Sequence, residues 1–347
     1  MAITIKEVAR AAGVSPSTVS RVISGNPAIS VETQERVRQI MKELGYFPNA
    51  IARSLARKTS LTLGFSISRS AEQAFANPFF AEAIRGAATV AQEKGYHILL
   101  STATDRKAER ERILDLSRQR RVDGFILSSS HIHDRLVADL RREGIPFVII
   151  GRPAGPMRGL HWVNNDNVAD ARKATEHLIN LGHQRIGFVS GPRDQVVSLD
   201  RQEGYRQAMK ERGLQIEARL LVEATFTEEG GYQGTKHLLV QAPEITALLV
   251  ADDLMATGAL RYLEETGRDV PGTISLITFN DTPLAQFARP SLTTVRIPIY
   301  QLGAAATRML VDLIEGRDVP GHELLTAELV IRKSCEAVRG TGMIGEP

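Results

Sequence analysis

Residues 4–56 decide the fold of the amino-terminal part of the chain, and they read TIKEVARAAGVSPSTVSRVISGNPAISVETQERVRQIMKELGYFPNAIARSLA. Thr4 followed by Glu7 has the spacing of a capping box, so a first helix is expected to begin there. Ser15 and Pro16 are typical of the cap and the first position of a second helix. The pattern predicts two short helices that meet across the glycine between them.

A third helix is expected after Ser30, because apolar residues recur at three- and four-residue spacing until Gly45 ends it. Its apolar face is formed by Val37, Ile40, Met41 and Leu44. Residues 48–56 predict one more short helix with Asn49 as its cap. Helices shorter than about 12–15 residues are marginal alone in water, so this last helix is expected to order only against a partner.

The charge of the chain is unevenly distributed. The whole chain has 43 Lys and Arg and 40 Asp and Glu, whereas residues 1–60 hold nine basic and four acidic residues. A basic segment on a slightly acidic body is expected when only that segment meets a polyanion such as nucleic acid. Charge alone leaves a chance excess as an equal alternative.

Cysteine usage and apolar runs indicate the compartment. Cys335 is the single cysteine, so no intrachain disulfide and no cysteine-ligated metal site is expected. The first residues lack the apolar core of a secretory signal, and no apolar run approaches the roughly 18 residues of a membrane span. A cytoplasmic protein without membrane partners is expected.

From Leu61 onward, apolar runs alternate with amphipathic stretches. Strands are expected at 61–67, 96–102, 122–130, 146–151, 185–191, 219–224, 245–252 and 274–280, and helices near 78–94, 107–120, 132–143, 166–181, 199–213, 228–241 and 253–267. This alternation predicts α/β architecture with parallel sheets covered on both faces. The segment GRPAGPMRG at 151–159 divides the strands into two series of about four, which favours two doubly wound lobes with a ligand cleft between them.

The helices, the turn and the YFPNAIARSL segment occur in the order found in the head and hinge of the lactose-repressor/galactose-repressor family, which the chain resembles. Residues 177–192, 200–209, 247–271, 274–281 and 289–298 look like the body of that family. The resemblance implies a helix-turn-helix DNA-binding domain at 1–47, a hinge helix and linker at 48–60, and an effector-binding and dimerisation domain at 61–340. That domain is similar to periplasmic sugar-binding proteins, with lobe 1 at about 61–162 and 292–321 and lobe 2 at about 163–291 and 322–340.

The second helix has the character of a recognition helix. Such a helix needs small or polar residues at its amino end and a basic residue one turn on to reach a guanine. Pro16 offers only apolar contact, so base reading is expected from Ser17 and Arg21, with a merely solvated Arg21 as the alternative. Phosphate contacts are expected from the polar residues around it, Thr4, Ser15, Thr18 and Ser20.

In the hinge, Leu55 lies among small and basic residues with little core to join. The resemblance implies that it is a wedge, paired with its dimer mate, that enters the minor groove and kinks the duplex. Ordinary packing of Leu55 is the alternative. Asn49, Arg53 and Arg57 complete the expected DNA-binding surface of this segment.

The resemblance also implies an effector cleft at the strand ends, formed by Phe79, Phe80, Asn165, Asp166, Gln195, Val197, Ser198, Arg201, Phe226, Asp252, Asn280 and Asp281. Aromatic faces, a guanidinium group and carboxylate or amide groups suit a sugar. An isolated Arg and Asp more often form a surface ion pair, but agreement at several strand ends favours the cleft. Asp166 has a second interpretation, as the cap of the following helix.

Signals for catalysis are poor. None of the phosphate-loop, dinucleotide, zinc-protease or serine-hydrolase motifs occurs. His131, His133 and Asp134 have crude metal-ligand spacing but no further partner. Asp252 and Asp253 are adjacent and cannot flank a scissile glycosidic bond from opposite sides. Binding rather than turnover is expected, with no metal and no cofactor.

The resulting hypothesis is a homodimeric repressor that binds a pseudo-palindromic operator and responds to a sugar. Residues 162–183 and the ending at Asp281 look like the maltose-responsive members, so maltose or another α-glucoside is expected. The alternatives are a purine or other corepressor, a transport-type sugar-binding protein and a sugar-modifying enzyme. The carboxyl end lacks a leucine heptad, which favours a dimer over a tetramer. A bacterial cytoplasmic location, on the nucleoid when operator-bound, follows from the hypothesis.

Overall fold

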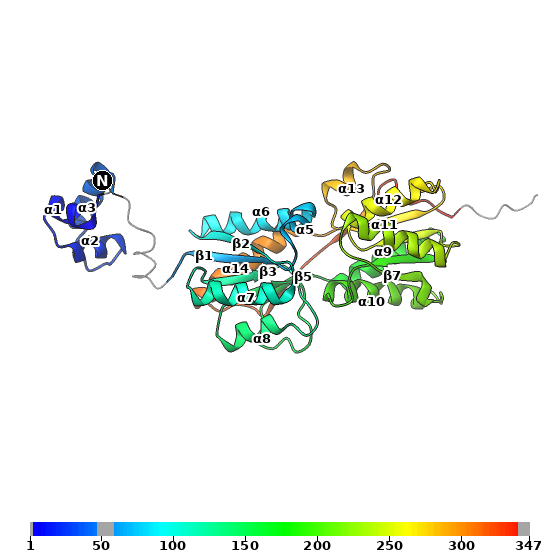
Figure 1. The fold of residues 1–347 in the computed structure, drawn as a ribbon, viewed down its shortest axis with the longest axis horizontal. Coiled ribbons are helices and arrows are strands. Elements are labelled where there is room, and N and C mark those ends of the chain that lie inside the picture. The colour runs from blue at the N-terminus through cyan, green and yellow to red at the C-terminus, as the bar shows by residue number, and fades with distance from the viewer. Residues whose placement is uncertain (1–2, 47–58, 339–347) are drawn as a thin grey trace, which may run out of the picture.

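The computed structural model describes residues 3–46 and 59–338, and Figure 1 shows its three parts. The head consists of α1 (Ile5–Ala12), α2 (Pro16–Ile23) and α3 (Val31–Glu43). The expected capping box at Thr4 and the side-chain cap at Ser15 are confirmed. The helices bury a small core of Val8, Ala9, Ala12, Val19, Val22 and Val37. Leu44 was expected in that core but is 36% exposed, because it follows the last turn of α3.

The first lobe is a six-stranded sheet in the order β11-β5-β4-β3-β1-β2, and all neighbouring strands are parallel. Its strands are β1 (Thr62–Ile67), β2 (His97–Thr102), β3 (Gly124–Leu127), β4 (Phe147–Ile150), β5 (Trp162–Asn165) and β11 (His322–Leu325). Its helices are α5 (Ala71–Ala76), α6 (Pro78–Glu93), α7 (Arg106–Arg118), α8 (Arg135–Arg142) and α14 (Ile299–Ile314). Helices α6 and α14 pack together, and α7 and α8 cover the opposite face (Figure 1).

The second lobe repeats this plan in the order β12-β10-β9-β8-β6-β7, with β12 as an antiparallel edge strand. Its strands are β6 (Ile186–Ser190), β7 (Leu221–Glu223), β8 (Ala247–Val250), β9 (Ser275–Phe279), β10 (Thr293–Arg296) and β12 (Glu328–Val330). Its helices are α9 (Asn167–Asn180), α10 (Val196–Glu211), α11 (Glu228–Gln241), α12 (Asp253–Glu265) and α13 (Pro283–Phe287), with one 3-10 turn at Ala218–Leu220. The two doubly wound lobes are confirmed, although each sheet has six strands rather than about four.

The chain crosses between the lobes at different positions from those expected. Strand β5 pairs with β4, so the first sheet continues through Asn165 and does not end at Trp162. Strand β10 pairs with β9, which places residues 293–296 in the second lobe, while β11 pairs with β5 in the first. The predicted boundaries were wrong here because short strands near a crossover carry no periodicity that says which sheet they join.

Close helix packing in the first lobe depends on two glycines. A Cβ at Gly86 on α6 would lie 2.0 Å from the carbonyl oxygen of Tyr300 on α14, and a Cβ at Gly303 would lie 2.0 Å from that of Ala83. The two backbones therefore touch, which is possible only without side chains at the crossing. In the described part of the chain, no helix is long and apolar enough to cross a membrane.

Candidate functional site

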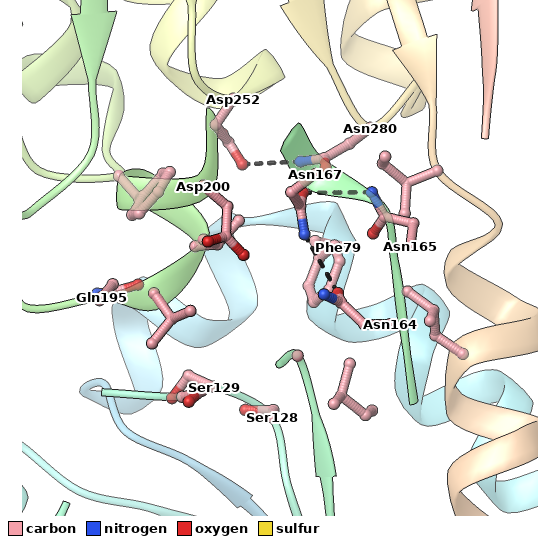
Figure 2. A pocket seen from close by; sticks show the side chains of 18 of the residues that line it. Phe79, Ser128, Ser129, Asn164, Asn165, Asn167, Gln195, Asp200, Asp252 and Asn280 are labelled. Carbon is pink, nitrogen blue, oxygen red and sulfur yellow. Dashed lines mark hydrogen bonds between the residues drawn. The ribbon is translucent and has the colours of Figure 1, made fainter. Parts of the chain in front are cut away.

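A cavity of about 750 Å³ of atom-free space, part of it open to solvent, lies between the two lobes. Both sheets contribute to its wall through the loops that follow the carboxyl ends of their strands, as expected for doubly wound folds. Figure 2 shows Ser128 and Ser129, which follow β3 of the first lobe, across the cavity from Asp200 and Asp252 of the second. The predicted cleft is therefore present as a cavity.

Asp252 lies at the centre of a polar cluster that links the lobes. It follows β8 and caps α12, where its Oδ1 accepts a hydrogen bond from the Leu254 amide at 2.8 Å. Its Oδ2 accepts from Nδ2 of Asn280 at 2.9 Å and from Nδ2 of Asn77, in the first lobe, at 3.0 Å. Three donors satisfy this buried carboxylate, and the one from Asn77 joins the two lobes.

Arg201 on α10 is 5% exposed and points at the same cluster. Its Nε donates to Oδ1 of Asn167 at 3.2 Å and its Nη1 donates to the Ala251 carbonyl at 2.5 Å. The guanidinium carbon lies 4.3 Å from the centre of the Phe279 ring. Burial lowers the pKa of Arg201 to about 10, partly opposed by Asp252, so it remains a cation at neutral pH. Two of its five N–H groups are used, which leaves donors for a ligand.

Arg69, which follows β1, reaches across the cavity from the first lobe. Its guanidinium carbon lies 5.4 Å from the ring centre of Phe80 and 5.0 Å from that of Phe226, and Nη1 donates to the Phe226 carbonyl at 3.2 Å. Burial lowers the pKa of Arg69, and the Asp252 carboxylate opposes that shift. The guanidinium covers these two aromatic rings, which leaves Phe79 as the partly exposed aromatic of the cavity.

A second contact between the lobes is an ion pair. Arg152, after β4, donates from Nη2 and Nε to the two carboxylate oxygens of Asp200 on α10, at 2.5 and 3.2 Å. The two-point geometry fixes both groups at the cavity wall. Nearby, Asn165 donates to Asn167 at 3.2 Å and to Asp170 at 2.7 Å, so the wall here is formed by interlinked amides (Figure 2).

The backbones of the two lobes also touch at the cavity edge. The Ile132 amide donates to the Asp194 carbonyl at 2.9 Å, and the Val196 amide donates to the Ser130 carbonyl at 3.0 Å. His131 is buried there, with Nδ1 at 3.2 Å from Oδ2 of Asp194. No group of three or more potential ligands among residues 3–46 and 59–338 could hold a metal ion.

Nine of the twelve expected effector residues line the cavity: Phe79, Phe80, Asn165, Gln195, Val197, Arg201, Phe226, Asp252 and Asn280. Asp166 does not, because it is exposed and its Oδ1 caps α9 through the Ala169 amide at 3.0 Å, as in its second interpretation. Ser198 is fully buried beneath the cavity wall. Asp281 turns away and binds Arg296 and Arg332 at 2.7 and 2.5 Å.

The remaining lining residues were missed: Arg69, Asn77, Ser128, Ser129, Ser130, Ile150, Gly151, Arg152, Asn164, Asn167, Val196, Asp200, Ile297 and Leu302. A signal existed for the serines and for Ile150 and Gly151, because they end expected strands. Arg69 and Asn77 had none, since they lie beyond a strand end in a segment without a periodic pattern. Their place depends on how the lobes close.

In the head, the expected recognition surface is solvent-exposed. Pro16, Ser17, Ser20 and Arg21 are exposed on α2, and the Arg21 side chain has no partner among the described residues. The Ser15 hydroxyl lies 2.7 Å from that of Ser17 and 2.9 Å from that of Thr18, and the Thr4 hydroxyl donates to Glu7 at 2.9 Å. The expected hinge contacts, Asn49, Arg53, Leu55 and Arg57, lie outside the described residues.

Comparison with known proteins agrees with this arrangement. Residues 4–49 match the family model described as bacterial regulatory proteins, lacI family, and residues 175–335 match a periplasmic binding protein-like domain. The HTH-type transcriptional regulator CelR of Thermobifida fusca is 36% identical over 333 residues, which cover 95% of this chain and 98% of CelR. The chain belongs to the lacI family. It is a DNA-binding transcriptional regulator, and regulators of this family are not enzymes.

Other members of the lacI family are similar over nearly the whole chain. MalR of Streptococcus pneumoniae is 38% identical over 304 residues, which cover 85% of this chain and 92% of MalR. A CelR–cellobiose complex superposes with a TM-score of 0.76 at 35% identity, covering 96% of this chain and 99% of the other. The lac repressor dimer bound to operator and an anti-inducer superposes with a TM-score of 0.83 at 29% identity, covering 97% and 100%.

Proposed function

We propose that this lacI-family member is a repressor whose affinity for its operator is controlled by a sugar bound in the cavity between the lobes. The observation that carries the proposal is the convergence of Arg201, Asp252 and Asn280 on that cavity. A guanidinium, a carboxylate and an amide together supply the donors and acceptors that vicinal hydroxyls of a sugar can use. Phe79 offers a ring face for the apolar side of the sugar.

The charged side chains that line the cavity are largely engaged with one another. Arg152 is paired with Asp200, and the Asp252 carboxylate opposes the lowered pKa values of Arg201 and Arg69, which leaves one cation in excess among these five groups. Sugar hydroxyls can accept hydrogen bonds from guanidinium N–H groups and donate to Asp252 without a charge of their own. Within the neutral sugars we propose maltose or another α-glucoside; the cellobiose complex of the relative CelR supports a disaccharide as the ligand.

We further propose that the chain acts as a homodimer that binds a pseudo-palindromic operator. The exposed Ser17 and Arg21 of α2 are the base-reading pair, because they lie one helical turn apart on the free face of the recognition helix. Arg21→Ala is expected to weaken binding by about 1–3 kcal/mol, with specificity relaxed at one base position of each half-site. Deletion of residues 1–58 is expected to abolish operator binding and to preserve sugar binding.

The effector is identified by thermal unfolding in the presence of maltose, cellobiose, ribose or guanine, because only a ligand of the folded state raises the unfolding temperature. A shift with maltose supports the full proposal. A shift with cellobiose or ribose alone retains a sugar and corrects its class. A shift with guanine alone contradicts the sugar and points to a corepressor-dependent regulator.

The site is tested with Arg201→Ala and Asp252→Ala, which are expected to bind operator but no longer respond to the sugar. Because Arg201 is buried, Phe79→Ala is the milder variant, and Phe75→Ala is its matched control. Phe75 on α5 is 67% exposed and does not line the cavity. The readout is an operator titration with and without the sugar. A normal response in Phe79→Ala and Asp252→Ala would place the effector elsewhere, and a response that tightens binding would make the sugar a corepressor.

A further inference from the structure

The carboxyl end of α7 carries the basic segment Arg118-Gln-Arg-Arg121. Arg118 is paired with Glu143 at 2.8 Å, but Arg120 and Arg121 are exposed and their side chains make no hydrogen bond or ion pair with the described residues. The end of α8 lies beside it and adds Arg141, which is also exposed and without a described partner. Two unpaired arginines in succession, with a third from the neighbouring helix, leave this surface positively charged.

The backbone of Arg120 is in the left-handed region, with φ of 54°. The Arg120 amide donates to the Ser117 carbonyl at 2.8 Å and the Arg121 amide donates to the Leu116 carbonyl at 3.0 Å, which is the Schellman arrangement of a helix end. Six other helices of the two lobes have glycine at the equivalent position: Gly95, Gly144, Gly182, Gly213, Gly267 and Gly316. A residue with an L side chain is disfavoured at this position, so Arg120 lowers the stability of the fold relative to glycine.

The basic segment lies where the body joins the DNA-binding head. Asp123, two residues beyond Arg121, accepts hydrogen bonds from the Ser60 amide at 2.7 Å and from the Ser60 and Thr59 hydroxyls. Its own amide donates to the Thr62 carbonyl at 2.8 Å, at the start of β1. Parallel strands begin at the same edge of a sheet, so the end of α7 lies at the edge that the chain enters from the head.

Three of the acidic groups near this end are already engaged, and the exposed Asp115 on α7 acts on Arg118 through its charge. Asp123 is bound to Thr59 and Ser60, Glu143 to Arg118, and Asp139 to Arg110 and Arg142. The nearest polyanion when the protein is on its operator is the DNA held by the head, because twelve residues separate Tyr46 from Thr59, a span of at most about 45 Å when fully extended. Tethering to the head raises the effective concentration of DNA phosphates at this surface.

We propose that Arg120 and Arg121, together with Arg141 of α8, form a second DNA-binding surface that contacts backbone phosphates of the operator region independently of base sequence. The guanidinium groups pair with phosphate oxygens and release condensed counterions. The contact adds affinity and salt dependence to the specific contacts of α2. It lies on the effector-binding body, so a change in lobe arrangement that moves the body relative to the head also changes this contact.

The test uses the full-length protein with the double change Arg120→Gly and Arg121→Gln. Glycine fits the left-handed position, so the variant is expected to fold and to unfold at a slightly higher temperature than wild type. The matched control is Lys107→Gln with Arg112→Gln, which removes the same charge from exposed positions of α7 farther from the hinge. Arg120→Lys with Arg121→Lys keeps both charges.

Binding is measured over a series of salt concentrations, on an operator duplex selected in vitro with the wild-type protein and extended by about one helical turn on each side. Each lost phosphate contact reduces the magnitude of the slope of log K against log salt concentration by about 0.9. For the Gly/Gln variant, the magnitude of this slope is therefore expected to be smaller by about 2 to 4 per dimer. The control and the lysine variant are expected to keep the wild-type slope. A wild-type slope in the Gly/Gln variant, or an equal loss in the control, overturns the proposal.

Discussion

Asp253 is a buried carboxyl whose ionisation is expected to make the stability of the second lobe depend on pH. It is 1% exposed at the start of α12, where Oδ2 accepts a hydrogen bond from the Thr282 amide at 2.7 Å and Oδ1 lies 3.4 Å from the Thr294 hydroxyl. Burial raises the pKa of Asp253 from 3.8 to about 7, and the adjacent Asp252 carboxylate adds to the shift. The two hydrogen bonds are too few to offset the loss of water.

The direction of the effect follows from this raised pKa. Between pH 3.8 and about 7 the folded chain keeps the proton on Asp253, whereas the unfolded chain releases it. The free energy of unfolding therefore decreases as the pH rises through this range and is level above it. Over the full range between the two pKa values, the free energy of unfolding decreases by on the order of 4 kcal/mol. Between about pH 5 and about pH 8 it decreases by about 3 kcal/mol.

The perturbation is Asp253→Asn, which removes the titration and keeps an oxygen for the Thr282 amide. Equilibrium urea unfolding of both proteins is followed by circular dichroism at about pH 5 and about pH 8. From about pH 5 to about pH 8, the free energy of unfolding of the variant, taken relative to that of wild type, is expected to rise by about 3 kcal/mol. The comparison between variants is needed because His177 and His183, whose pKa burial lowers, add stability as the pH rises.

Asp269→Asn is the control, because Asp269 is exposed and its side chain forms no described hydrogen bond. It is expected to follow wild type at both pH values. A stability difference between wild type and Asp253→Asn that is the same at both pH values would refute the reasoning, since Asp253 would then be ionised in the folded chain throughout.

Three further predictions concern packing and capping. Gly86→Ala is expected to destabilise the first lobe by about 3 kcal/mol in urea unfolding, because its Cβ would meet the Tyr300 carbonyl at 2.0 Å, whereas Gly272→Ala, with only one neighbour at 3.4 Å, is expected to be nearly neutral. Tyr205→Phe is expected to cost about 1 kcal/mol in the same assay, because the buried hydroxyl donates to the Ile186 carbonyl at 2.8 Å; an unchanged midpoint would mean that the carbonyl finds another donor. Ser15→Ala is expected to lower the stability of the isolated head by about 1 kcal/mol in thermal unfolding, because it removes the side-chain cap of α2, and a Ser17→Ala control should cost less.

Much of the fold could be predicted because it depends on local patterns. The capping box at Thr4 and the Ser15-Pro16 start of α2 each act within one helical turn, so the head helices were predicted with nearly correct ends. The buried parallel strands β1, β6, β8 and β9 are continuous apolar runs, which are recognisable without knowledge of their neighbours. Lobe membership of β10 and β11 was mispredicted, because pairing depends on the path of the chain between the lobes.

The candidate site divides in the same way. Residues at strand ends, such as Asp252 and Asn280, could be named from the sequence because every parallel strand delivers its carboxyl end to the same edge of the sheet. Asp281 lies two residues beyond β9 and Ser198 lies in the first turn of α10, which follows β6, yet Ser198 is buried and two arginines hold Asp281 away from the cavity. Sequence position near a strand end therefore selects a neighbourhood and not a side-chain direction.

By itself the sequence determined the helix-turn-helix head, the two-lobed α/β body and the family, because caps, periodicity and motif order are properties of contiguous residues. Only the tertiary structure decided that Arg69 covers Phe80 and Phe226, that Asn77 reaches Asp252, and that Arg152 meets Asp200. The contacts of Arg69 with Phe226, of Asn77 with Asp252 and of Arg152 with Asp200 join the two lobes. Residues 48 to 175 positions apart in the chain come together there because the two sheets close on one another, and no local pattern records that closure.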